Sequence, residues 1–202
     1  SWAIIDDREH YRTLKYVYIA PVSVPAFLFG RGIAKFLTGS LGVIITLLGG
    51  ILFLNVPFNA SIVDWPLFFL SLILGITMLA LMGLLLAGIT LMTARHSYYI
   101  GDVVAGGLFL FSGAIFPLEV LPVFLRPIGY ALPITYWLEL LRRALVGGVA
   151  EAFPTFITLS NGQLVLILVA SSIVFGLIGI LTFSYFDRHA RERGLIDQTT
   201  NF

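Results

Sequence analysis

Long apolar runs separated by short polar or charged stretches dominate this sequence. No Asp, Glu, Lys or Arg occurs from Phe36 to Val63, a run of 28 residues, and none occurs from Trp65 to Ala94, a run of 30. A helix needs about 20 mostly apolar residues to cross the hydrocarbon core of a bilayer. Each run therefore predicts a membrane-spanning helix, and two further apolar stretches predict two more. The expected spans are 33–54, 67–91, 98–116 and 164–186.

Features at the ends and within these runs support helices that pack together. Asp64, Trp65 and Pro66 form a favourable helix start, with a capping side chain, an interfacial aromatic ring and a proline in the first turn. Small residues spaced four apart allow another helix to approach closely, which predicts packing rather than substrate contact. The spaced pairs are Ser71 with Gly75, Gly83 with Ala87, and Ser172 with Gly176.

A proline-rich segment interrupts the pattern after the third span. Pro117, Pro122, Pro127 and Pro133 fall within 17 residues of a chain that has 9 prolines. Each proline lacks a backbone donor and biases the residue before it toward extended geometry, here Phe116, Leu121, Arg126 and Leu132. Lipid cannot satisfy a broken backbone, so the segment 117–146 must be packed in protein or lie at the interface, and it is a candidate cap or gate.

The sequence of this segment predicts two short helices on the external side, one on each side of residues 127–133. In the second helix, one side would carry Leu138, Leu141 and Leu145, and the other would carry Glu139, Arg142 and Arg143. That division predicts an amphipathic helix lying along the interface. The alternative is a simple external loop.

The N-terminal stretch 6–18 is the most charged part of the chain. Tyr11 and Leu14 lie on one helical face, and Asp6 with Glu9 fits a capping box, so a short amphipathic helix is expected before Pro21. One interpretation is a solvated interfacial helix. The other is a coupling helix that transmits the movement of a cytoplasmic partner to the span that follows.

Composition places the chain among polytopic membrane proteins. It is 58% hydrophobic and 11% charged, with a mean hydropathy of +0.98, so it has too few charges to cover a soluble globule. The net charge is +1 and the basic residues are scattered, which argues against nucleic acid as a partner. The absence of cysteine excludes disulfides and cysteine-ligated zinc.

The distribution of Lys and Arg predicts the topology. Three basic residues, Arg126, Arg142 and Arg143, fall on the side of the broken segment. The other side takes Arg8, Arg12, Lys15, Arg31, Lys35, Arg95, Arg188, Arg191 and Arg193. The richer side is expected to be cytoplasmic, which places stretch 6–18 and the tail 187–202 inside and the broken segment outside.

Groups for catalysis or metal binding do not converge in the sequence. The three histidines, His10, His96 and His189, lie far apart at the predicted cytoplasmic edge, and no phosphate-binding glycine loop precedes Lys15 or Lys35. Asp102 lies about one turn into its span and is expected to reach the interface. The chain is therefore not expected to be an enzyme, and any ATP chemistry would belong to a separate chain.

Several motifs around the broken segment resemble those of the ABC-2 class of ATP-binding-cassette export permeases. These motifs are Ser-Gly-Ala-Ile-Phe-Pro (112–117), Tyr-Ala-Leu-Pro-Ile-Thr-Tyr (130–136) and Leu-Glu-Leu-Leu-Arg-Arg-Ala-Leu (138–145). Relatives of this class include daunorubicin-type drug, nodulation-factor and polysaccharide exporters. The resemblance implies an all-α polytopic domain of the type V exporter kind, with a short external helical hairpin at residues 117–146.

The same resemblance bears on the N-terminal part of the chain. It implies that the whole of 1–202 is one permease domain with four complete spans, preceded by residues of the family domain that lie before Ser1. It also assigns stretch 6–18 to the coupling helix, although Arg12 replaces the usual glycine. The residues expected to contact the ATPase are Asp7, Arg8, Glu9, Tyr11, Arg12, Thr13 and Leu14.

The function that the resemblance implies is ATP-driven export across a prokaryotic cell membrane, the inner or plasma membrane. Two ATPase subunits would hold ATP and Mg, this chain would hold no cofactor, and a second permease copy or a paralogue would complete the path through the lipid. The cargo would be amphipathic, lipid-linked or drug-like. The alternatives are a secondary transporter or channel, disfavoured because the spans carry almost no ionisable residue, and a membrane-embedded enzyme or scaffold.

Two groups of residues are candidates for the transport route. The expected gate residues are Pro117, Pro122, Pro127, Gly129, Tyr130, Pro133, Arg142 and Arg143. The candidate residues of the substrate path are Phe109, Phe111 and Phe116.

Overall fold

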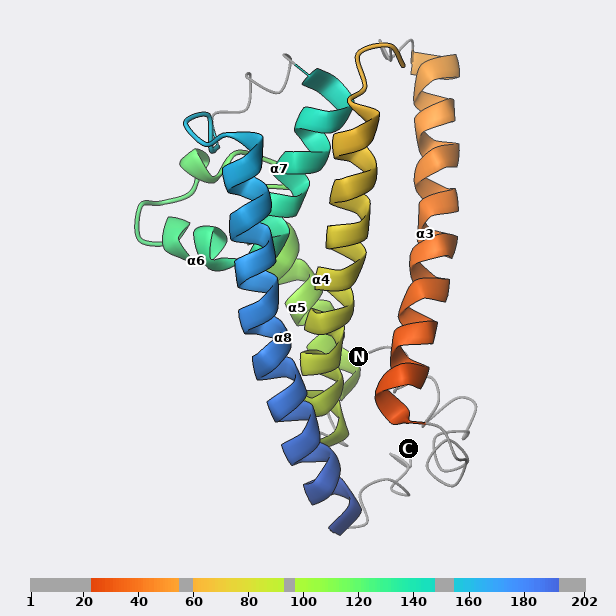
Figure 1. Ribbon diagram of the computed structural model, residues 1–202, viewed down its shortest axis with the longest axis vertical. Coiled ribbons are helices and arrows are strands. Elements are labelled where there is room, and N and C mark those ends of the chain that lie inside the picture. Colours follow the sequence, from red (N-terminus) through yellow and green to blue (C-terminus); the bar gives the residue numbers. More distant parts are fainter. Residues whose placement is uncertain (1–22, 55–59, 93–96, 148–154, 193–202) are drawn as a thin grey trace.

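The computed structural model describes residues 23–54, 60–92, 97–147 and 155–192, and every regular element in these ranges is a helix. The predicted all-α membrane fold is confirmed. The elements are α3 (Val24–Leu54), α4 (Trp65–Met92), α5 (Ser97–Phe111), the 3-10 helix η2 (Leu118–Val120), α6 (Arg126–Ala131), α7 (Pro133–Val146) and α8 (Asn161–Glu192) (Figure 1).

Among the described residues, three helices are long and apolar enough to cross a membrane: Phe29–Leu54, Trp65–Ile89 and Asn161–His189. The predicted span 98–116 is shorter than expected, because α5 has only 15 residues and ends at Phe111. At about 1.5 Å per residue it covers roughly 22 Å, less than the roughly 30 Å of a hydrocarbon core. The prediction of four complete spans is therefore not confirmed.

The helix starts follow from local capping. The Asp64 carboxylate accepts a hydrogen bond from the Leu67 N–H at 3.1 Å, which confirms the predicted start of α4 at Trp65. Helix α8 begins before the predicted residue 164, because Ser160 and Gln163 form a capping box. The Ser160 N–H donates to Gln163 Oε1 at 2.8 Å, and the Gln163 N–H donates to Ser160 Oγ at 3.3 Å.

Helices α4 and α8 run side by side and approach closely at glycines (Figure 1). A Cβ atom added at Gly88 would lie 3.0 Å from the Phe183 Cα, and one added at Gly179 would lie 3.0 Å from the Leu81 carbonyl oxygen. One at Gly176 would lie 2.9 Å from Leu81 Cδ1, so the predicted packing role of this glycine is confirmed. At these glycines the helices approach backbone to backbone or accept a leucine side chain, which explains how two long apolar helices pack closely.

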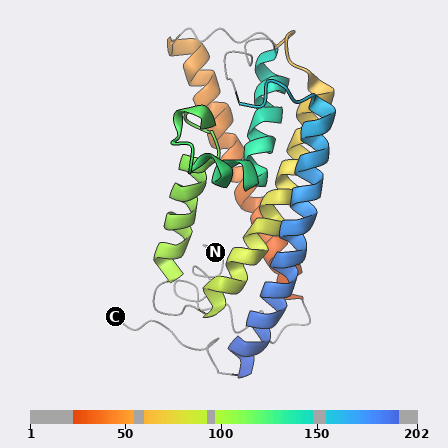
Figure 2. The ribbon, with the colours of Figure 1, turned by 90° about the vertical axis from the view of Figure 1, so that its left-hand side faces the viewer.

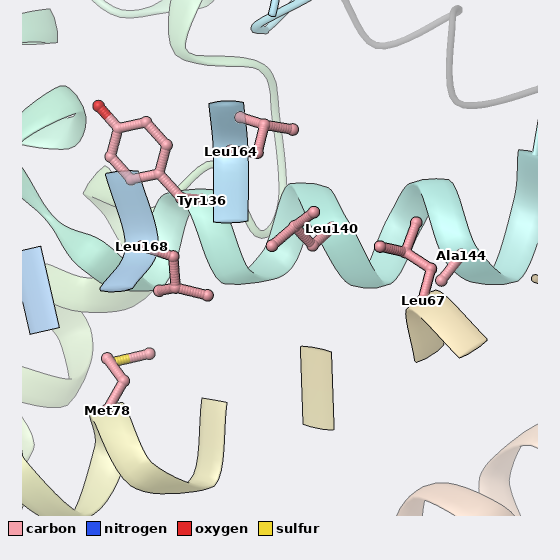
Figure 3. Close-up of a cluster of buried hydrophobic side chains, with 7 residues drawn as sticks. All are labelled: Leu67, Met78, Tyr136, Leu140, Ala144, Leu164 and Leu168. Carbon is pink, nitrogen blue, oxygen red and sulfur yellow. The ribbon is translucent and has the colours of Figure 1, made fainter. Parts of the chain in front are cut away.

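The hydrophobic core lies where α7 packs against this pair. It consists of Leu67 and Met78 from α4, Tyr136, Leu140 and Ala144 from α7, and Leu164 and Leu168 from α8 (Figure 3). Met78, Leu140, Leu164 and Leu168 are 0% exposed. The core is thus displaced toward the end of the bundle at which α4 and α8 begin.

Helix α3 stands apart from this core in Figure 1, and helix α5 stands apart from it in Figure 2. In the most apolar window of α3 none of the residues is buried within the chain, against 22% for α4 and 28% for α8. Helix α5 rises from the end of the molecule at which α8 finishes and stops part of the way along the bundle. From that height α7 continues to the opposite end (Figure 2).

The expected orientation of α7 is wrong. Its buried face includes Tyr136, Leu140 and Ala144, but also Glu139, which is only 2% exposed. The predicted polar side of the helix is therefore not turned to solvent. The physical reason is that α7 packs against both α4 and α8, so that lipid or water can reach little of its surface.

Candidate functional site: the recessed broken segment

The prolines break the chain largely as their chemistry requires. Leu121 and Leu132, which precede Pro122 and Pro133, are extended, with ψ angles of 148° and 122°. Arg126 differs from the prediction, since it is the first residue of α6 with Pro127 in the first turn. Helix α6 therefore overlaps residues 127–133 instead of ending before them, and η2 is the only regular element between α5 and α6 in this described stretch.

The end of α5 fits closely against α6. After Phe111 the chain turns at Gly113, which has a φ of 73°, a conformation that side-chain-bearing residues adopt rarely. A Cβ atom added at Gly129 of α6 would lie 2.6 Å from the Phe111 carbonyl oxygen and 2.7 Å from Leu118 Cδ2. Gly129, a predicted gate residue, is thus buried and required by packing.

Side chains within the segment satisfy the backbone groups that the breaks leave free. Thr135 Oγ1 donates to the Gly129 carbonyl at 2.7 Å, and the Tyr136 hydroxyl donates to the Tyr130 carbonyl at 2.7 Å. Arg126 Nε donates to the Leu121 carbonyl at 2.9 Å. Irregular backbone at membrane depth is tolerated only where partners of this kind satisfy its polar groups. In this segment the segment's own side chains are those partners.

An ionic cluster on α7 joins the segment to its neighbours. The Glu139 carboxylate accepts hydrogen bonds from Arg142 Nη1 at 2.6 Å and from Arg143 Nε at 2.9 Å. Other guanidinium donors reach backbone carbonyls: Arg142 Nη2 donates to Gly113 at 3.1 Å, and Arg143 Nη2 donates to Phe156 at 2.7 Å. One buried carboxylate therefore holds two arginines that fasten α7 to the end of α5 and to the chain before α8.

The segment 155–160 covers α7 from the other side. Phe156 has a φ of 65°, which is rare for a residue with a side chain. Its ring stacks on Tyr136 at 4.7 Å between centroids and lies 5.6 Å from the Tyr130 ring. Thr155 is 3% exposed and contacts two residues of η2. Its Oγ1 donates to the Glu119 carboxylate at 2.7 Å and accepts from the Leu118 N–H at 3.2 Å.

A tryptophan fixes α7 to α4. Trp137 Nε1 donates to the Ser71 carbonyl at 2.9 Å, and the indole ring occupies the space where a side chain at Gly75 would stand. The predicted packing role of the Ser71 and Gly75 pair is confirmed, although a side chain and not a second backbone makes the close approach. The corresponding prediction for Gly83 is not supported, because nothing lies within 4 Å of an added Cβ there.

The predicted gate residues fall into three groups by exposure. Pro122, Pro127 and Tyr130 are exposed, whereas Gly129 and Pro133 are buried. Pro117, Arg142 and Arg143 lie between these extremes. All the predicted gate residues belong to the broken segment. Another molecule can reach this segment at the exposed ones, Pro122, Pro127 and Tyr130.

The remaining predicted residues are spread more widely. On α5, Phe109 is 61% exposed and Phe111 is partly buried, as is Phe116 beyond the helix. The coupling residues in stretch 6–18 lie outside the described part of the chain. Asp102 is exposed near the start of α5.

Three residues of this site were not predicted from the sequence: Glu119, Thr155 and Phe156. Glu139 was predicted on the polar side of the helix and not as a buried residue. The spacing of Glu139 three and four residues before Arg142 and Arg143 was a usable signal for ion pairing. No local signal connects Glu119 with Thr155, which are 36 residues apart. In the described residues no group of three His, Cys, Asp or Glu could hold a metal ion.

Comparison with known proteins relates the chain to membrane transporters. The sequence profile of the family described as "ABC-2 type transporter" matches residues 9–146. The chain is also similar to the "Probable multidrug ABC transporter permease YbhS" of Escherichia coli strains K12 and O157:H7, with 26% identity over 167 residues. That match covers 81% of this chain and 41% of each relative. The chain therefore spans less than half the length of these curated relatives, and no solved structure gave a significant match.

Proposed function

Because the chain belongs to the ABC-2 type transporter family, we propose that it is the membrane-spanning permease subunit of an ATP-driven exporter. The observation that carries this proposal is the family match to residues 9–146, which takes in two of the three long apolar helices and the whole broken segment up to Val146. Permeases of this family are not themselves enzymes, so ATP hydrolysis is assigned to a separate ATPase subunit.

We assign different roles to the two ends of the helix bundle. The start of α3, the end of α4, the start of α5 and the end of α8 lie at one end, which the count of basic residues favours as cytoplasmic (Figure 2). Stretch 6–18 precedes α3 and would act there as the coupling element for two ATPase subunits. The broken segment lies toward the opposite end and would control the exit.

We assign the cargo to amphipathic, lipid-linked or drug-like molecules. The exposed surface of α3, α5 and the broken segment is apolar and aromatic, and it includes Leu52, Phe53, Phe109 and Phe124. Such a surface suits a cargo with a large apolar part. A second permease copy or a paralogue, which would make a homodimer or a heterodimer, would face this one across the path in the cell membrane.

A reconstituted system tests the proposal. The permease is co-purified with its ATPase in lipid nanodiscs, and ATP hydrolysis is measured with a panel of drugs, lipids and lipid-linked glycans. We expect at least one class to stimulate hydrolysis, and we expect transport into vesicles to stop when the phosphate-binding lysine of the ATPase is replaced. Transport that continues with the inactive ATPase would instead support a secondary transporter.

A further inference from the structure

A carboxylate and several aromatic rings come together at one corner of the broken segment. The Glu119 carboxylate accepts a hydrogen bond from Thr155 Oγ1 at 2.7 Å, and the next residue, Phe156, carries a ring that lies 5.6 Å from the ring of Tyr130. The Phe156 ring also stacks on the Tyr136 ring, with 4.7 Å between the ring centroids and an interplanar angle of 19°. Residues from η2, α6, α7 and the segment before α8 therefore meet here.

The Glu119 carboxylate differs from that of Glu139 in its charged partners. It forms no ion pair within the described part of the chain, although Arg126 is close, because the Arg126 donors are directed at backbone oxygens. Arg126 Nη2 donates to the carbonyl of Glu119 itself at 2.6 Å, and its Nε donates to the Leu121 carbonyl at 2.9 Å. Glu139, in contrast, is paired with two guanidinium groups.

Accessible apolar side chains lie close to Glu119 in the sequence. Tyr130 is 38% exposed, and Val120, Val123 and Phe124, which follow Glu119 within five residues, are 69%, 74% and 77% exposed. A partly buried carboxylate without an ion pair favours a cationic partner. The faces of aromatic rings attract cations for a separate reason, the negative charge of the π system.

We propose that Glu119, Tyr130 and Phe156 form a binding site for lipophilic organic cations. The carboxylate would balance the charge, the rings would contact the cation, and the exposed valines and Phe124 would contact its hydrocarbon groups. This inference deepens the proposed exporter function by naming a class of cargo. It rests on that function only for the step from binding to transport.

Binding of a matched pair of probes tests the site. Tetraphenylphosphonium and tetraphenylborate have nearly the same shape and opposite charges. Each is titrated into the permease in phosphatidylcholine nanodiscs, with protein-free nanodiscs as the blank. We expect saturable binding of tetraphenylphosphonium alone, and equal binding of both ions would overturn the proposal, since it would indicate apolar partition.

Glu119→Gln is the decisive variant. The glutamine side-chain oxygen can still accept the hydrogen bond from Thr155, so the segment should keep its geometry while the charge is removed. We expect the affinity for tetraphenylphosphonium to fall at least about tenfold, equivalent to about 1.4 kcal/mol. Glu119→Asp, which keeps the charge, should retain most of the binding, and an unchanged affinity in Glu119→Gln would overturn the proposal.

Two further variants separate the site from general effects of charge and packing. Asp102→Asn removes an exposed carboxylate near the start of α5, away from the broken segment, and should leave the affinity unchanged. Tyr130→Phe should bind nearly as well as the unaltered protein, whereas Tyr130→Leu should bind several-fold more weakly because the ring is lost. An equal loss in Asp102→Asn and Glu119→Gln would reduce the effect to net charge and contradict the site.

The outcome for this site can be distinguished from the outcome for the exporter function. Binding that depends on Glu119 without stimulation of the assembled ATPase by tetraphenylphosphonium would support the site and count against the transport of this cargo. Stimulation that Glu119→Gln leaves unchanged would support the exporter and overturn the site.

Discussion

Glu139 is the residue whose loss should affect the fold most. Its carboxylate is 2% exposed and holds the guanidinium groups of both Arg142 and Arg143. Glu139→Ala would remove the carboxylate that both guanidinium groups bind and leave the two positive charges beside each other. We expect the free energy of unfolding in detergent to fall by about 3–5 kcal/mol, measured by equilibrium denaturation.

Removal of a carboxylate at an exposed position provides the control for this prediction. Asp102→Asn should alter the free energy of unfolding by no more than about 0.5 kcal/mol. A loss below about 1 kcal/mol in Glu139→Ala would mean that the ionic cluster does not hold the segment together.

Two glycines offer a second comparison at the scale of single residues. Gly129→Ala would place a methyl group 2.6 Å from the Phe111 carbonyl oxygen, and we expect it to lower the free energy of unfolding by about 1–3 kcal/mol. Gly83→Ala adds the same group where nothing lies within 4 Å, and it should be neutral or stabilise the helix by up to about 1 kcal/mol. Equal effects at the two positions would contradict the close fit of α6 against α5.

The N-terminal stretch 6–18 is the element whose assigned role most needs a test. If it couples the permease to an ATPase, the double variant Arg8→Ala and Glu9→Ala should abolish substrate-stimulated ATP hydrolysis. Folding should be little affected, since solvated charges contribute about 0–1 kcal/mol to stability. ATPase co-purification and transport are measured together, and survival of both would refute the coupling role.

Arg12→Gly provides a matched change in the same stretch. It restores the residue that the family resemblance implies, so ATPase binding should be retained. A large loss of binding would show that Arg12 itself contacts the ATPase.

For the whole molecule, the proposed exit gate predicts a pattern of accessibility. The sequence has no cysteine, so single cysteines can be introduced without a background signal. Tyr130→Cys and Val123→Cys replace side chains that are 38% and 74% exposed, and both should react with a membrane-impermeant maleimide added from outside. Leu118→Cys, at a position that is 0% exposed, should not react.

Movement of the gate is tested with the same variants. We expect the labelling rate at Tyr130→Cys to change between the nucleotide-free transporter and an ATP-trapped one, with Val123→Cys as the reference. Labelling of Tyr130→Cys only from the cytoplasmic side would refute the topology. An unchanged rate would leave the topology intact and refute a moving gate.

The sequence by itself determined the features that depend on neighbouring residues. Uninterrupted apolar runs identified three helices that the structure shows to be long enough for spans, because hydropathy and length decide this property. The extended geometry of Leu121 and Leu132 followed from the prolines after them, and the start of α4 followed from the Asp64 cap. These effects act over a few residues and can be read from the chain.

Only the tertiary structure decided how the broken segment folds and packs. The length of α5 and the position of α6 depend on the close contact of Gly129 with Phe111, which no periodicity encodes. Likewise, the polar side of α7 became interior because α4, α8 and the segment 155–160 surround it. The bond from Trp137 to Ser71 joins residues 66 apart, and such partners become known only when distant elements are placed side by side.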